Sequence, residues 1–269
     1  TIFPIFSVAA LASTNTVGRP FVGRSNGPLL LALVFLMGVG PLLPWRRATG
    51  RNLVRALRYP LAVALATGVV LVAAGMRQPV AVLAFSTCAL AVTGIVHEWI
   101  RGTRSRHGKG EAYPVAFARL LSGNRPRYGG YVVHLAIMML ATGAIASSFF
   151  SVQRDFVMKP GETASLGGYT FRYLDVSRTT FDDRDEEVAR FEVYAGDSYL
   201  GVMRPFRADY RNFRVSATRG AIRSTPIEDF YIVPSEFNDD GRAVFRVLIN
   251  PMVWWMWAAG PLLALGTVF

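Results

Sequence analysis

Residues 129–150 read GGYVVHLAIMMLATGAIASSFF, an apolar stretch in which His134 is the single residue among His, Lys, Arg, Asp and Glu. An α-helix needs about 20 mainly apolar residues to cross the hydrocarbon core of a bilayer. This stretch therefore predicts a membrane-spanning helix. The segment that follows it, residues 151–250, carries 14 basic and 16 acidic side chains, so we expect the chain to leave the membrane there.

Similar apolar runs recur along the 269 residues. The five expected spans are Pro28–Trp45, Pro60–Met76, Pro79–Ile100, Gly129–Phe150 and Pro251–Phe269. The composition agrees, because 52% of the residues are hydrophobic and only 17% are charged, whereas a soluble domain carries about 25% charged residues. The sequence predicts a multi-pass α-helical membrane protein with about five transmembrane helices, of which the second span is the shortest.

The positive charges are concentrated in two short loops. They are Arg46, Arg47, Arg51, Arg55 and Arg58 in the first loop, and Arg101, Arg104, Arg106, Lys109, Arg119, Arg125 and Arg127 in the second. A net charge of +11 on a soluble protein would suggest nucleic-acid binding. Loops rich in Lys and Arg between apolar spans are instead typical of the cytoplasmic side of a membrane protein. We therefore expect no nucleic-acid partner, a lipid bilayer as surroundings, and residues 151–250 on the extracytoplasmic side.

The segment 151–250 shows the alternation of apolar and polar residues that is typical of half-buried strands. The four clearest runs are Tyr169–Val176, Val188–Tyr194, Phe213–Ala217 and Ala243–Ile249. Gly167-Gly168 and Asn238–Gly241 are turn signals. We expect five to seven short strands in a small sheet or sandwich. The domain organisation is thus a membrane domain over 1–150, an extracytoplasmic all-β domain over 151–250 inserted between the last two helices, and a final transmembrane helix over 251–269.

His134 is the main candidate for chemistry. With a rise of about 1.5 Å per residue, it lies roughly 8 Å into its span, where an ionisable group is costly and commonly functional. A neutral imidazole is a common axial ligand of haem iron. The alternative is a polar side chain that hydrogen-bonds to a neighbouring helix. Gly129 and Gly130 would let a flat cofactor approach the backbone, or simply let another helix pack closely.

The other candidates have stronger structural alternatives. His97 and Glu98 end the third span and could shuttle protons, although an interfacial structural role is favoured. His107 is expected in a solvated, flexible loop. The tryptophans of the last span, Trp254, Trp255 and Trp257, form either an interfacial belt or a shelf against haem. The single Cys88, inside an apolar span, is expected to be a small core residue.

Several catalytic motifs are absent from the sequence: it has no CxxC, no P-loop pattern, no HExxH and no GxSxG. Glu98 is the single acidic residue in the expected spans, which argues against a carboxylate relay for protons or cations. The apolar opening Thr1–Ser13 has no charged start and is not a signal peptide. We expect it to be the tail of an earlier helix, and the chain to be part of a longer polypeptide or one half of a split one.

Five phrases together resemble the C-terminal half of the CcmF family. They are Gly38–Arg47 after the opening Thr-Ile-Phe-Pro, Glu98–Arg106, Asn124–His134 running on to Gly143–Ser148, Pro205–Tyr210 followed by Ile227–Tyr231, and Asn250–Gly260 leading to Gly266. The phrases occur in the family's order and with similar spacing from end to end of the chain.

The resemblance implies a component of a haem lyase (holocytochrome c synthetase) that works in cytochrome c maturation in the bacterial cytoplasmic (inner) membrane. The family joins haem, a transient substrate, to the CxxCH motif of an apocytochrome c. It also holds a haem b between two transmembrane histidines, thought to reduce the incoming haem iron. His134 matches the second of these histidines. The partners implied are the apocytochrome, a membrane-tethered haem chaperone, thiol-reducing subunits and the N-terminal half of the same protein. The β domain would lie on the periplasmic side.

The chain also departs from the family's pattern. Three features of the family are not in this sequence: the tryptophan-rich external segment that binds the incoming haem, the two external histidines that would hold that haem, and the other transmembrane ligand. We therefore expect the chain to be inactive as a lyase alone. The alternative is a non-catalytic membrane scaffold or transporter subunit with an external β binding module, in which His134 only packs.

Overall fold

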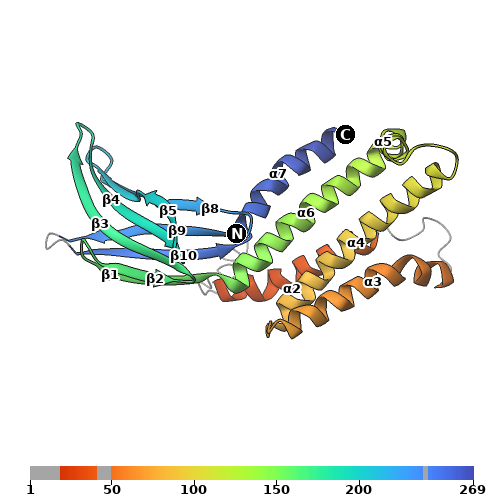
Figure 1. Cartoon of the computed structure of the whole chain (residues 1–269), viewed down its shortest axis with the longest axis horizontal. Helices are drawn as coiled ribbons and strands as arrows, with labels where there is room; N and C mark the ends of the chain where they lie inside the picture. The colour runs from red at the N-terminus through yellow and green to blue at the C-terminus, as the bar shows by residue number, and fades with distance from the viewer. Residues whose placement is uncertain (1–18, 41–49, 239–241) are drawn as a thin grey trace, which may run out of the picture. The chain divides into compact units, whose positions relative to one another are not determined.

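The computed structural model describes residues 19–40, 50–238 and 242–269. The chain divides into two compact units, Thr1–Ala141 with Ala259–Phe269, and Thr142–Ala258. Helices make up the described part of the first unit, and the second holds all of the described strands (Figure 1). The apolar opening at residues 1–13 lies outside the described residues, as do Arg46 and Arg47.

The helices alternate with short connections. They are α2 (Arg19–Val39), α3 (Gly50–Ala73), α4 (Pro79–His107), α5 (Tyr113–Gly123), α6 (Arg125–Phe150) and α7 (Val253–Val268). In the described part of the chain, three helical segments are long and apolar enough to cross a membrane: Ala56–Ala73 within α3, α4 and α6. Together with the β domain, these segments confirm the predicted class of membrane protein.

The first and last of the five expected spans correspond, within the described residues, to shorter apolar helices, Gly27–Val39 and Val253–Val268. The number of five spans stays a prediction. The expected end of the first span, residues 41–45, lies outside the described residues.

Three helices extend beyond the apolar runs that predicted them. Helix α3 starts at Gly50 instead of Pro60, α4 continues from Ile100 to His107, and α6 starts at Arg125. Hydropathy marks only the part of a helix suited to hydrocarbon, whereas backbone hydrogen bonding continues into polar flanks because arginine is a good helix former. Consequently His97 and Glu98 lie within α4 and do not end it.

The second Arg-rich loop contains a helix that was not expected. Helix α5 carries Pro114 in its first turn, where the missing N–H of proline does no harm. It packs on α4 at Gly102, where an added Cβ would come within 2.8 Å of Leu120 Cδ2. His107, predicted in a flexible loop, lies in the last turn of α4 and stacks on Tyr113 with ring centroids 3.8 Å apart.

Helix α4 is packed on one side by α2 and α3 (Figure 1). Small residues permit this packing: an added Cβ at Gly38 of α2 would lie 2.8 Å from Ala91 Cβ, and one at Gly68 of α3 would lie 3.1 Å from Ser86 Oγ. Cys88 is buried on α4, as predicted.

The second unit is built from two antiparallel sheets. The strands are β1 (Val152–Met158), β2 (Thr163–Leu166), β3 (Tyr169–Thr180), β4 (Arg184–Ala195), β5 (Ser198–Met203), β6 (Phe206–Tyr210), β7 (Val215–Arg219), β8 (Ala221–Ser224), β9 (Glu228–Phe237) and β10 (Ala243–Pro251). One sheet has the order β1-β10-β9-β8. The other has the order β2-β3-β4-β6-β7, with β5 also paired to β4.

Aromatic side chains from both sheets fill one core. The larger sheet contributes Phe171, Tyr173 and Phe191, and the smaller sheet contributes Phe230 and Phe245. All five side chains are fully buried. The rings of Tyr173 and Phe245 meet edge to face at 5.0 Å between centroids, an arrangement that aromatic pairs favour. The alternating strands thus form a sandwich.

The strand predictions are partly confirmed. Runs 169–176, 188–194 and 243–249 lie within β3, β4 and β10. The fourth run starts too early, because Arg214 has a φ of 49° and the strand begins at Val215. Ten strands among the described residues exceed the expected five to seven. The Gly167-Gly168 turn is confirmed, with positive φ at both glycines, whereas most of the expected turn at 238–241 lies outside the described residues.

Candidate functional site

His134 lies on α6, and its ring is oriented by the backbone of its own helix. Nδ1 is 2.6 Å from the carbonyl oxygen of Gly130, one turn earlier. Because a carbonyl can only accept, Nδ1 donates in this bond, and in the neutral form of the ring Nε2 is then the nitrogen that carries the lone pair. The side chain is partly buried. This arrangement presents one nitrogen lone pair from an apolar helix.

The two glycines beside His134 have different surroundings. An added Cβ at Gly129 would lie 2.7 Å from the carbonyl oxygen of Gly266 on α7, whereas one at Gly130 would meet nothing within 4 Å. In return, a Cβ at Gly266 would lie 2.8 Å from Val133 N. Gly129 therefore serves close packing of α6 on α7. Gly130 lies on the same helix face as His134, four residues away, and leaves that face open.

A charged cluster joins α4 to the start of α6. Glu98 forms ion pairs with Arg101 at 2.7 Å and with Arg127 at 3.0 Å, and its side chain is only 12% exposed. The Arg127 guanidinium also donates to the Tyr131 hydroxyl at 3.1 Å. The carboxylate of Glu98 is thus engaged in ion pairs within the protein. This agrees with the structural role that the sequence analysis favoured for His97 and Glu98. The pairing across α4 and α6 could not be read from the sequence, where Glu98 and Arg127 lie far apart.

The remaining histidines have local contacts. The ring of His97 lies 5.4 Å from that of Tyr59 on α3, and Nδ1 of His107 donates to the Glu111 carbonyl at 2.7 Å. Among the described residues, no three His, Cys, Asp or Glu side chains come together in a way that could hold a metal ion.

The tryptophans of α7 do not act as one surface. Trp254 and Trp257 are 43% and 76% exposed, which suits indoles at a membrane interface. Trp255 instead donates its indole N–H to the Pro226 carbonyl at 2.9 Å. Met252, with a φ of 59°, donates its backbone N–H to the Ile227 carbonyl at 2.8 Å. These two bonds fix the junction between the sandwich and α7, a role that the sequence did not indicate.

A family model described as the CcmF C-terminal beta-sandwich matches residues 149–251. This match includes every strand from β1 to β10.

Similarity to curated proteins extends along the whole chain. The cytochrome c-type biogenesis protein CcmF of Pseudomonas aeruginosa is 30% identical over 99% of this chain and 39% of its own length. The protein of the same name from Haemophilus influenzae is 25% identical, over 99% of this chain and 40% of its own length. The chain thus spans about two fifths of the length of these relatives.

A solved structure titled cytochrome c haem lyase CcmF superposes on 97% of this chain and 42% of its own chain, with a TM-score of 0.75 and 24% identity. At this identity the likeness supports the fold. Residues 149–251 thus match the family model of the CcmF C-terminal β-sandwich, and the chain as a whole is similar to about two fifths of the length of CcmF-type cytochrome c biogenesis proteins.

Proposed function

We propose that this chain is the C-terminal part of a haem lyase component that acts in cytochrome c maturation. The observation that carries the proposal is the similarity along 99% of the chain to proteins named for cytochrome c biogenesis. The solved relative carries haem lyase in its title. The chain would contribute to the lyase together with the remainder of a longer protein, and would not form thioether bonds by itself.

His134 holds one axial position of a haem b in this proposal. Two features of the residues support the fit: a ring held by Nδ1 donation to the Gly130 carbonyl, which directs Nε2 away from that bond, and open space beside Gly130. Histidine ligands of metals commonly donate their other N–H to a carbonyl or carboxylate, which fixes the tautomer and raises the basicity of the ligating nitrogen. The second axial ligand would come from outside this chain.

In this proposal the backbone of α6 orients the imidazole, through the bond from Nδ1 to the Gly130 carbonyl. Close packing on α7 at Gly129 holds that stretch of α6 in place. A haem iron with two imidazole ligands supplies one-electron transfer, with a potential set by its ligands and by burial. The role of this chain would be to hold the nitrogen ligand in place in an apolar setting, where burial helps to set the reduction potential of the haem iron.

The partners and the location follow from the same proposal. The protein would lie in the bacterial inner membrane with the sandwich on the periplasmic side. There it would meet an apocytochrome c, a membrane-tethered haem chaperone and thiol-reducing subunits. The concentration of arginines in the last turns of α4, in α5 and in the first turn of α6 supports this orientation.

Cytochrome c yield in cells tests the function. The full-length protein that contains this chain would be expressed in cells lacking their own copy, as wild type, His134→Ala and His107→Ala. We expect His134→Ala to lower covalently bound haem in c-type cytochromes at least tenfold, and the control His107→Ala to match wild type. Equal yields from His134→Ala and wild type, with equal protein levels, would point to a scaffold role and against the lyase proposal.

A further inference from the structure

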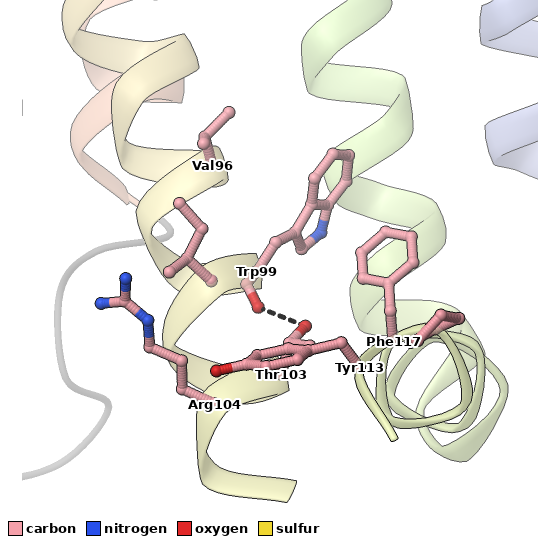
Figure 2. Close-up of a pocket in the computed structure, with 8 residues that line it drawn as sticks. Val96, Trp99, Thr103, Arg104, Tyr113 and Phe117 are labelled. Carbon is pink, nitrogen blue, oxygen red and sulfur yellow. Dashed lines mark hydrogen bonds between the residues drawn. The ribbon is translucent and has the colours of Figure 1, made fainter. Parts of the chain in front are cut away.

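A groove of about 610 Å³ opens between α4 and α5 (Figure 2). It is lined by Val96, Trp99, Ile100, Thr103, Arg104, Tyr113, Pro114 and Phe117. No residue of α6 contributes to this lining, so the groove is separate from the His134 site. Its position is fixed by the packing of Leu120 on Gly102, which brings α5 against α4.

The walls of the groove are apolar and partly uncovered. Val96 and Ile100 are 40% and 43% exposed. The rings of Trp99 and Phe117 face one another from α4 and α5, edge to face, with centroids 6.0 Å apart (Figure 2). Apolar surface of this kind is stabilised when it is covered by hydrocarbon. The groove therefore suits a methylene chain.

One end of the groove carries a positive charge that the described protein leaves unpaired. Four neighbouring arginines form ion pairs with Glu98 or Glu111; they are Arg101, Arg106, Arg119 and Arg127. Arg104 has no acidic partner among the described residues, although it lines the groove. A guanidinium is well suited to bind phosphate oxygens in pairs.

The sequence of α4 places the groove where hydrocarbon meets headgroups. The helix is mainly apolar up to Val96, and after His97 and Glu98 it carries Arg101, Arg104 and Arg106. From Val96 to Ile100 the helix rises about 6 Å, and about 6 Å more to Arg104. Tyr113 and Trp99 add the aromatic rings typical of this depth. Basic pockets between membrane helices at this level suit acidic lipid headgroups.

We propose that this groove binds one anionic glycerophospholipid, with an acyl chain along Val96, Ile100 and Phe117 and the phosphate on Arg104. The excess of basic over acidic side chains in this part of the chain disfavours a headgroup that carries its own cation, because the like charges repel. The bound lipid would cover the exposed apolar wall and neutralise Arg104, and so hold α5 against α4. This inference does not rest on the haem-lyase proposal.

Lipid binding to the delipidated full-length protein in detergent tests the proposal. Phosphatidylglycerol and phosphatidylcholine with the same acyl chains would be titrated separately, and bound lipid counted by native mass spectrometry. We expect phosphatidylglycerol to bind about tenfold tighter, the advantage of roughly one charge-assisted contact. Arg104→Gln should remove this preference and Arg104→Lys should keep most of it. Arg125→Gln, a change at another exposed arginine without an acidic partner among the described residues, should behave as wild type.

Three results would overturn the proposal. Equal affinity for the two lipids would show that the groove does not distinguish an anionic headgroup from a zwitterionic one. An equal loss in Arg104→Gln and Arg125→Gln would indicate attraction by the general positive charge. Displacement of the lipid by inorganic phosphate at equal concentration would indicate an anion site that does not need an acyl chain. Elution volume and circular dichroism of each variant would show that it is folded.

Discussion

Gly129 and Gly130 are neighbours on α6 whose substitution has different expected costs. Gly129→Ala would place a methyl group 2.7 Å from the Gly266 carbonyl oxygen, so α6 and α7 must separate. We expect a loss of about 1–3 kcal/mol in the free energy of unfolding. Gly130→Ala meets no atom within 4 Å and should be neutral, or stabilising by up to about 1 kcal/mol because alanine favours helix.

Thermal unfolding of the detergent-solubilised protein would compare the two glycine variants. A lower midpoint for Gly130→Ala than for Gly129→Ala would show that the packing of α6 on α7 has been assigned to the wrong glycine. The two glycines also show what residue patterns can predict. The sequence offered two roles for both, a close cofactor or close helix packing. Only the position of Gly266 on α7, distant in the chain, assigns the packing role to Gly129.

At the scale of the strands, three ion pairs make the sandwich sensitive to acid. Arg246 and Arg190 lie directly opposite Asp155 and Asp175 on neighbouring strands, and hydrogen bonds from these arginines lower the pKa of each carboxyl below its usual 3.8. Arg211 lowers the pKa of Asp185 in the same way. Because the folded state favours the ionised carboxyls, their contribution is complete above about pH 5 and is lost as the pH falls through the lowered values.

The acid sensitivity can be tested with one substitution. Asp175→Asn removes one of these carboxyls, so we expect it to lower the midpoint of thermal unfolding at pH 7 and to have a smaller effect at pH 3. Asp197→Asn is the control, since Asp197 lies in an exposed turn and forms no ion pair among the described residues. A difference between Asp175→Asn and wild type that stays constant from pH 7 to pH 3 would contradict the assignment.

Secondary structure was predictable where one physical signal dominates. Alternation located β3, β4 and β10, because Phe171, Phe191 and Phe245 point into one core. Shorter strands such as β2 and β8, with four residues each, offer too few alternations to detect. Helix α5 was missed because its basic surroundings indicated a loop, although Pro114 followed by apolar residues was a usable signal for a helix start.

For the whole molecule, the charge pattern predicts which side of the membrane each part occupies. With the single Cys88 replaced by alanine, cysteines introduced by Lys109→Cys and Asp197→Cys would report on the connection after α4 and on the sandwich. We expect a membrane-impermeant maleimide to label the Asp197→Cys protein in intact spheroplasts, and the Lys109→Cys protein only after permeabilisation. Labelling of both before permeabilisation would contradict the proposed orientation.

The site was predictable only in part. His134 stood out because an ionisable group inside an apolar span is rare, and the structure adds the orientation of its ring by the Gly130 carbonyl. The ion pairs of Glu98 and the groove beside Arg104 depend on which helices meet, and the sequence contains no local sign of this. The haem assignment itself stays a prediction.

The most direct measurement is the absorption spectrum of the purified full-length protein, oxidised and reduced, for wild type, His134→Ala and His107→Ala. We predict the bands of a low-spin b-type haem in wild type and in His107→Ala. His134→Ala should lose them or convert to a high-spin spectrum, and added imidazole should restore part of the low-spin signal to His134→Gly. Wild-type protein without haem, or an unchanged spectrum in His134→Ala, would contradict the assignment of His134 as an axial ligand.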